Sequence, residues 1–409
     1  MHIALVTPSW PPGRYPNGIV TYVRWLREGL LLDGHRVTLV AGSIGEGASG
    51  PDLHRVELSL RDRLSRAFGR WIQRRPVSVF DGGQGIASTL NRINASDPID
   101  VIEMEESFGW VAEVGARVPV PLVCKLHGPA FLTSTDEEKR RPLIQEKMRR
   151  EGVALSRLPV IVAPALFTLS QTLSRYDLRP ILSTQSLNPV ALGQDAPLWD
   201  LSTCDTSTIL FVGRFDKLKG ADLVLAAFQK LHALHSRLRL IIVGPDVGLL
   251  QPDGSVSKFQ PYIESIGNPP LTEAISFRGP LEPTEIPNIR LSALVTVVCS
   301  RFENQSYTAL EAMLQGCPLV CTDTAGLSEM VEHEVTGLKS RAADADDLAT
   351  QILRLVDDPA WAARLARAGR EWVEEKHSPR AVAAQSVEIY RRAIALRQSG
   401  VTPSRLAGA

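Results

Sequence analysis

The sequence has few cysteines and no excess of charge of either sign. Its five cysteines stand apart, with no Cys-x-x-Cys pair, at Cys124, Cys204, Cys299, Cys317 and Cys321. A zinc ribbon or a thioredoxin-type redox centre is therefore excluded, and reduced, mostly buried thiols are expected. The 45 Lys and Arg residues balance the 45 Asp and Glu residues, which removes a bulk electrostatic case for nucleic-acid binding.

Long apolar runs are also missing. The longest candidate, LPVIVAPALFTL at 158–169, is interrupted by prolines and is shorter than the ~18 residues that a membrane-spanning helix needs. The opening MHIALVTPSW has no basic region before its apolar stretch, so an export signal is not expected. A chain of 409 residues with this composition is expected to form two globular domains in the cytoplasm.

A dinucleotide fingerprint and a metal motif are absent as well. The segment TPSWPPGRYPNGIV (7–20) contains no Gly-x-Gly-x-x-Gly, and DGGQGIAS (81–88) lacks the third glycine, which disfavours an NAD or FAD dehydrogenase. Asp344 and Asp346 form an Asp-x-Asp, but they precede the helical stretch LATQILRLV and are better explained as a helix cap. We expect no metal site and no cofactor.

The first half of the chain alternates short Val/Ile/Leu runs with amphipathic stretches, and the same rhythm restarts after residue 205. Continuous apolar strands separated by helical periodicity are typical of parallel sheets covered on both faces. The sequence therefore predicts an α/β protein with two doubly wound, Rossmann-like domains facing across a cleft. We place them at 1–190 and 191–378, with a linker at 185–207, where periodicity is lost. A last helix at 379–398 is expected to cross back to the N-terminal domain.

The segment FVGRFDKLKGADLVLAAF (211–228) predicts a strand that ends near Gly213 and a helix that begins after Gly220. Arg214 and Lys219 lie in the loop between them. Two cations at the carboxyl end of a parallel strand suit a diphosphate group.

A second motif follows a later strand, in RFENQSYTALEAMLQGCPLV (301–320). Glu303 is expected on the loop at the start of a helix, and Glu311 about two turns into it. Between them, the backbone N–H groups of Gln305, Ser306 and Tyr307 are expected at the helix N-terminus, which is a ready anion site.

Together these segments resemble the retaining GT-B glycosyltransferases of family four, which use nucleotide sugars. The resemblance runs nearly end to end and rests on five elements. They are a glycine loop from Asn17 to Tyr22, KLHG at 125–128, GR…KG at 213–220, Glu-x7-Glu from Glu303 to Glu311, and AGLSEMV…TGL at 325–338.

The resemblance implies roles for individual residues. Arg214 and Lys219 would hold the donor diphosphate, Glu311 the ribose and Glu303 the transferred sugar, while His127 would lie near sugar and acceptor. The implied catalytic residues are His127, Arg214, Lys219 and Glu303. Further donor contacts are implied at Gly18, Gly213, Arg278 with Gly279 for the base, Gln305, Ser306, Tyr307 and Thr308. The acceptor is expected near Asn17, Glu105 and His127.

The sequence departs from the family pattern at two places. It has Asn17-Gly18 in place of a glycine pair, and Asn304-Gln305-Ser306 in place of glycines after the first glutamate. Side chains there narrow the space near diphosphate and sugar. The sequence therefore leaves open the base of the donor (UDP, GDP or ADP) and the donor sugar. It also leaves open the hydroxyl acceptor, which can be a sugar, a lipid-linked sugar or a small molecule.

The sequence also admits three other interpretations. Glu103, Glu105 and Glu106 suggest the paired carboxylates of a glycosidase, but acids after a strand more often form a solvated loop. A nucleotide-sugar-binding scaffold without turnover and a GT-B sugar-nucleotide epimerase are the alternatives to a transferase.

The segment LRDRLSRAFGRWIQRRP (60–76) carries six arginines interleaved with apolar residues. It predicts either a helix that binds the inner face of the membrane or an acidic partner, or a solvated arginine-rich helix that packs its apolar stripe on its own domain.

Overall fold

The computed structural model describes residues 1–13, 17–57, 82–193, 196–251 and 253–400. The chain divides into two compact units, Met1–Pro189 with Pro379–Ala409 (unit 1) and Val190–Ser378 (unit 2). The arginine-rich segment at 60–76 lies outside the described residues, so its membrane contact stays a prediction. In the described part of the chain, no helix is long and apolar enough to cross a membrane.

Unit 1 is built on a seven-stranded parallel sheet in the order β3-β2-β1-β4-β5-β6-β7. The order reverses between β1 and β4, and ligands of open α/β sheets bind at the carboxyl ends of strands beside such a reversal. Its strands are β1 (His2–Trp10), β2 (Arg36–Ile44), β3 (Leu53–Arg55), β4 (Val101–Glu105), β5 (Leu122–Lys125), β6 (Val160–Ala163) and β7 (Leu182–Gln185).

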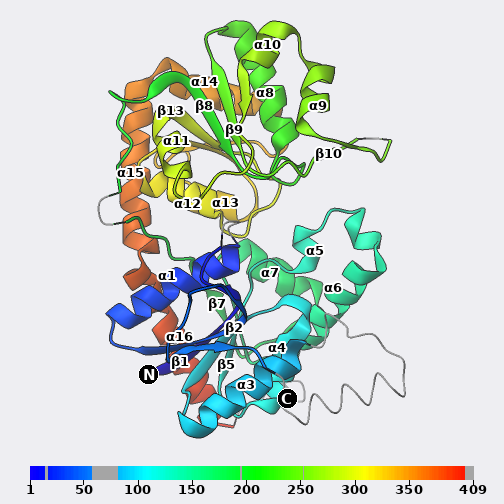
Figure 1. The fold of residues 1–409 in the computed structure, drawn as a ribbon, viewed down its shortest axis with the longest axis vertical. Coiled ribbons are helices and arrows are strands. Elements are labelled where there is room, and N and C mark those ends of the chain that lie inside the picture. The colour runs from blue at the N-terminus through cyan, green and yellow to red at the C-terminus, as the bar shows by residue number, and fades with distance from the viewer. Residues whose placement is uncertain (14–16, 58–81, 194–195, 252, 401–409) are drawn as a thin grey trace. The chain divides into compact units, whose positions relative to one another are not determined.

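The helices of unit 1 cover both faces of this sheet (Figure 1). They are α1 (Gly18–Leu32), α3 (Gly82–Ser96), α4 (Trp110–Arg117), α5 (Ala130–Thr133), α6 (Pro142–Leu155), α7 (Leu166–Arg175) and α16 (Pro379–Gln398), with short 3₁₀ turns at η2 (Ser107–Gly109) and η3 (Glu138–Arg140). The last helix, α16, packs on α1 so closely that a Cβ at Gly29 would lie 2.0 Å from the Pro379 carbonyl oxygen. The expected return of the C-terminal helix to the N-terminal domain is therefore confirmed.

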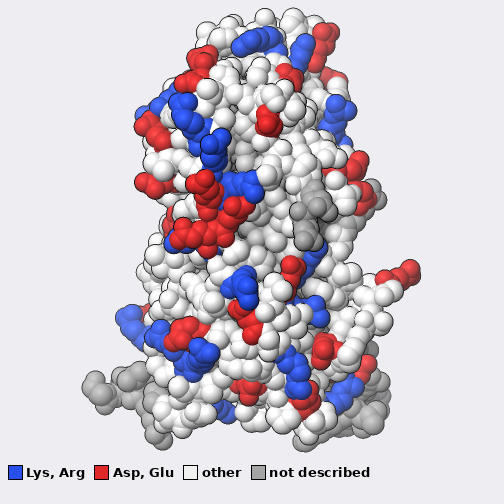
Figure 2. All heavy atoms as spheres, turned by 90° about the vertical axis from the view of Figure 1, so that its left-hand side faces the viewer, with Lys and Arg blue, Asp and Glu red and all other residues white. Residues whose placement is uncertain are grey.

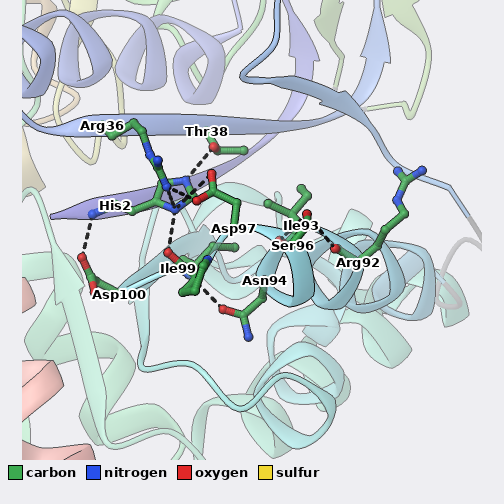
Figure 3. Close-up of polar contacts among 11 residues, drawn as sticks. His2, Arg36, Thr38, Arg92, Ile93, Asn94, Ser96, Asp97, Ile99 and Asp100 are labelled. Atoms are coloured by element: carbon green, nitrogen blue, oxygen red, sulfur yellow. Dashed lines mark hydrogen bonds and ion pairs between the residues drawn. The ribbon is translucent and has the colours of Figure 1, made fainter.

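A polar network fixes the amino-terminal edge of this sheet (Figure 3). The buried His2 ring lies 2.8 Å from the Thr38 hydroxyl on β2, and its backbone N–H donates to the Asp100 carboxylate at 2.7 Å. Arg36 pairs with Asp97 beside it. These contacts hold β1 between β2 and β4, so the carboxyl end of β1 is fixed at the opposite edge.

Unit 2 contains a six-stranded parallel sheet in the order β12-β9-β8-β13-β14-β15. The order reverses between β8 and β13, which makes their carboxyl ends the place for a ligand. Its strands are β8 (Asp205–Val212), β9 (Arg239–Val243), β12 (Ile275–Phe277), β13 (Ala293–Val298), β14 (Leu319–Thr322) and β15 (Leu338–Ser340), with a hairpin of β10 (Leu249–Leu250) and β11 (Val256–Ser257).

The central strands β13 and β14 of unit 2 are largely apolar because the sheet is covered on both faces there, and every residue of both strands is buried. Its helices are α8 (Ala221–Leu234), α9 (Phe259–Ile266), α10 (Pro269–Glu273), α11 (Ile286–Ser292), α12 (Tyr307–Leu314), α13 (Ala325–Met330), α14 (Ala345–Asp357) and α15 (Pro359–His377). The predicted cap is confirmed, since Asp344 accepts from the N–H groups of Asp346 and Asp347 at the start of α14.

Charges of both signs are mixed on the surface. On the described part of the face in Figure 2, acidic and basic side chains are interspersed, and the basic ones form no continuous field. The five cysteines are unpaired, and four of them are buried.

Candidate active site

The loop after β8 is organised by one buried carboxylate. Asp216 Oδ2 lies 2.8 Å from Arg214 Nε, and its Oδ1 accepts from the Lys219 backbone N–H at 2.7 Å. Asp216 thus orients the Arg214 guanidinium and fixes the backbone at Lys219, the two cations that the sequence assigns to a diphosphate. Sequence reasoning did not single it out, although an acid between two cations in a loop after a strand was a usable signal.

Gly220 brings this loop against the end of β13. Its φ is +80°, and an added Cβ would lie 2.1 Å from the Cys299 carbonyl oxygen. A side chain is therefore excluded both by backbone conformation and by space. The glycine of the GR…KG element allows the loops after β8 and β13 to approach each other.

Lys219 and Glu303 meet at this point. Lys219 Nζ lies 2.6 Å from Glu303 Oε1, and the Ser300 hydroxyl donates to the same oxygen at 2.8 Å. Both ionic side chains are largely, though not wholly, covered. The structure therefore brings together two of the predicted catalytic residues as an ion pair, which their sequence positions alone did not indicate.

The loop that follows Glu303 is packed tightly. Asn304, Gln305 and Ser306 are buried, and Ser306 caps α12 by accepting from the Ala309 N–H. An added Cβ at Gly326 would lie 1.6 Å from the Asn304 carbonyl oxygen. The AGLSEMV segment thus supports the start of α12, where Tyr307 and Thr308 form the first turn.

Glu311 lies further along α12 and forms an ion pair with a buried arginine of α11. Its Oε2 lies 2.9 Å from Nη2 of Arg290, a residue of α11 that is only 2% exposed, while Glu311 is 39% exposed. Arg278 follows β12, and its backbone N–H donates to the Ile242 carbonyl at 2.9 Å. The roles of Glu311 in ribose binding and of Arg278 in base binding stay predictions.

The three glutamates at the end of β4 in unit 1 are buried, so the interpretation of a solvated loop was wrong. Glu103, Glu105 and Glu106 are 4%, 7% and 1% exposed. Glu103 accepts from the hydroxyls of Tyr22 at 2.7 Å and Tyr390 at 2.9 Å. Glu105 accepts from a backbone N–H within its own loop. Buried carboxylates persist because hydrogen-bond donors surround them.

Glu106 holds the backbone of the loop that carries His127. Its Oε2 accepts from the N–H of His127 and its Oε1 from the N–H of Gly128, both at 2.9 Å. Burial, then repulsion from Glu105 and Glu151, raises the pKa of Glu106 to about 8. One acid thus fixes a strand-to-helix loop at the carboxyl edge of the sheet.

His127 is half-buried against α1. Its ring meets Tyr22 edge-on, with ring centroids 4.9 Å apart. Burial, with a contribution from the nearby Lys125 cation, lowers the pKa of His127 to about 3. The imidazole is therefore neutral at physiological pH and can donate one hydrogen bond and accept another.

Asn17 and Gly18 mark the start of α1. The Asn17 side chain caps this helix, since its Oδ1 accepts from the Ile19 N–H at 2.9 Å, and both residues are exposed. The cap explains why asparagine suits a position where the family has glycine. Contacts of Asn17 with an acceptor and of Gly18 with a donor stay predictions.

Replacing Glu106 with glutamine is expected to remove a pH dependence of stability. The pKa of Glu106 is about 8 in the fold, against an ordinary 4.5, so the native state holds the extra proton between these values. The stability that Glu106 contributes is therefore full below the ordinary pKa and lost as pH rises through the raised one. In urea titrations from about pH 5 to 8.5, wild type should lose stability relative to Glu106→Gln. A constant difference across that range would contradict the assignment.

Part of the chain matches a known family model, and the whole chain is similar to a curated relative. Residues 202–372 match the family described as "Glycosyl transferases group 1". The chain is 23% identical to an uncharacterized glycosyltransferase of Methanocaldococcus jannaschii over 96% of this chain and 99% of that protein.

Solved structures show the same fold. Sucrose-phosphate synthase from Thermosynechococcus elongatus is similar at a TM-score of 0.73 and 22% identity, covering 96% of this chain and 99% of that chain. HepE from Anabaena, solved in complex with UDP, is similar at a TM-score of 0.66 and 16% identity, covering 95% and 99%. The expected GT-B fold is confirmed by these structures.

Proposed function

We propose that the protein is a retaining glycosyltransferase that moves a sugar from a nucleoside-diphosphate sugar to a hydroxyl acceptor in glycan, polysaccharide or glycoconjugate biosynthesis. The observation that carries the proposal is the placement of Arg214, Lys219 and Glu303 on the loops after β8 and β13, at the reversal point of the unit 2 sheet. Glu311 lies about one turn into the next helix, closer to its start than the two turns expected from the sequence. In this proposal the two cations bind the diphosphate, Glu303 binds the sugar and Glu311 binds the ribose.

Leaving-group stabilisation is the proposed contribution of the two cations. The bond from the anomeric carbon to the diphosphate oxygen breaks as the acceptor oxygen bonds to that carbon, and negative charge grows on the diphosphate. Arg214, whose guanidinium pairs with Asp216, and Lys219, whose backbone N–H Asp216 accepts, would neutralise that charge.

Retention of configuration is proposed to occur on one face of the sugar. Glu303 is neutralised by Lys219 and hydrogen-bonded by Ser300, which makes it a poor nucleophile and a good partner for sugar hydroxyls. The acceptor proton would then go to the departing phosphate oxygen. His127, neutral in the fold, is proposed to contact the sugar and acceptor through a hydrogen bond.

A ligand screen tests the proposal. Because HepE was solved with UDP, UDP and UDP-sugars are the first probes, followed by the GDP and ADP series. A ligand at ~100 times its Kd adds ~2.7 kcal/mol of stability, which a thermal shift would detect. The anomeric configuration of the product is then read by NMR.

The outcomes separate the alternatives. Transfer with retention supports the proposal, and transfer with inversion overturns the mechanism. Binding without transfer or hydrolysis would indicate the scaffold, and release of an epimerised sugar nucleotide would indicate the epimerase. No shift with any nucleotide would overturn nucleotide-sugar use altogether.

Transfer is expected to survive chelation of metal ions. The charge on the diphosphate is met by Arg214 and Lys219, so a divalent cation is not required for leaving-group departure. Initial rates measured with excess EDTA should match those without it. Abolition by EDTA and recovery with manganese would contradict this prediction.

A further inference from the structure

Arg290 is a buried cation that the proposed mechanism leaves without a role. It lies on α11, only 2% exposed, and is among the largest fully enclosed side chains of the described residues. A buried charge is costly unless it is paired and hydrogen-bonded. Its partners therefore determine what it does.

The side-chain partners of Arg290 lie on one side of α12, with Glu311 inside the helix and Gln315 at its C-cap. Its Nη2 meets Glu311 Oε2 at 2.9 Å, and its Nη1 donates to Gln315 Oε1 at 2.6 Å. Glu311 and Gln315 are four residues apart and so are neighbours on the helix surface. The planar guanidinium spans them as a fork, a geometry that a lysine cannot reproduce.

The two partners differ in exposure. Gln315 is fully buried, which fixes the inner end of the fork, whereas Glu311 is 39% exposed. Arg290 therefore holds one oxygen of a carboxylate that reaches solvent. Its own carbonyl is also engaged, by the Cys317 thiol at 3.7 Å, so α11 presents the guanidinium from a fixed backbone.

This arrangement limits the freedom of the Glu311 side chain. An unpaired glutamate on a helix surface samples many rotamers and must be ordered when a ligand binds. With Oε2 held by Arg290, the carboxylate is pre-oriented for acceptance of hydrogen bonds from a vicinal diol. A ligand that lacks those hydroxyls would form no hydrogen bond with the Glu311 carboxylate and would gain no affinity from its orientation.

We infer that Arg290 is a positioning residue for Glu311 and, through it, sets the preference of the site for ribose hydroxyls over a deoxyribose. The inference rests on the proposed function, in which Glu311 binds the ribose of the donor nucleotide. Arg290 touches no part of the nucleotide itself in this scheme. It acts on affinity only through the carboxylate that it orients.

The test compares UDP with 2′,3′-dideoxy-UDP by calorimetry, or the GDP or ADP pair if the screen selects that base. Losing hydrogen bonds to a charged group weakens binding about ten- to 150-fold, so wild type should prefer the ribonucleotide by that ratio. In Arg290→Met the ratio should fall towards one, because UDP weakens while the dideoxy analogue binds unchanged. Arg290→Lys, which keeps the charge without the fork, should give an intermediate ratio.

Two controls make the result decisive. Glu311→Ala should abolish the preference, and adding Arg290→Met to it should change neither affinity further, because the two residues act as one unit. If Arg290→Met does not fold, as judged by circular dichroism, Arg290→Lys carries the test. If Arg290→Met lowers the affinity for both nucleotides equally, the role of Arg290 is merely structural and the inference is overturned. Absence of nucleotide binding by wild type would instead overturn the proposed function.

Discussion

Lys219→Met is expected to lower kcat about 100- to 1,000-fold, the loss typical of removing one preorganised group that stabilises developing charge. Lys219 is one of two cations proposed to neutralise the departing diphosphate, and its ammonium lies 2.6 Å from Glu303. Methionine keeps the length and apolar stem of lysine while removing the charge. Steady-state rates and calorimetry with nucleoside diphosphate measure the loss in turnover and in product affinity.

Two controls isolate the charge of Lys219. Lys217→Met makes the same substitution in the same loop at an exposed lysine and should leave turnover within about twofold of wild type. Lys219→Met combined with Glu303→Gln removes both charges of the pair, so it should regain thermal stability lost by the single variant without regaining activity. Wild-type turnover in Lys219→Met would refute the role of Lys219 in leaving-group stabilisation.

The fold could be predicted because its signal is local. The buried part of a parallel strand covered on both faces is apolar, and a helix with its own periodicity follows it. The apolar half of β8 and the helix α8 are therefore visible in a single stretch of sequence. The Glu-x7-Glu spacing is equally local, since the strand end, the loop and the helix α12 that carry it are continuous.

The pairings within the site could not be predicted in this way. Lys219 and Glu303 are 84 residues apart, and their contact depends on the close approach that Gly220 allows. Arg290 precedes Glu311 by 21 residues, in a helix that follows a different strand. A single chain shows which residues carry charge, but tertiary packing decides which charges meet.

The glutamates of β4 were misinterpreted for a related reason. A charged side chain at the end of a strand is normally solvated, and nothing in IEMEESFGW indicates otherwise. Glu103 is buried because its donor Tyr390 arrives from α16, 287 residues away. Glu106 is buried because the backbone of the next strand-to-helix loop donates to it.

The two glutamates of the Glu-x7-Glu motif are expected to differ in kind when mutated. Glu311→Ala should weaken free nucleoside diphosphate and donor alike, about ten- to 150-fold, because ribose is common to both ligands and a hydrogen bond to a charged group is lost. Glu303→Gln should lower turnover, since the proposed contact of Glu303 is with the transferred sugar. Calorimetry with nucleoside diphosphate and initial-rate kinetics with donor separate the two effects.

The ion pair between Lys219 and Glu303 also predicts how Glu303→Gln changes the affinity for nucleoside diphosphate. Without ligand, Glu303 holds Lys219, and a diphosphate must compete with that carboxylate for the ammonium. A partly exposed ion pair is worth ~0.2 to 1 kcal/mol, so Glu303→Gln should bind nucleoside diphosphate up to about fivefold more tightly than wild type. Tighter product binding together with slower turnover is a combination that general damage to the site does not produce. If Glu303→Gln instead loses nucleotide affinity as severely as Glu311→Ala, the assignment of the sugar to Glu303 is wrong, and Glu303 binds the nucleotide.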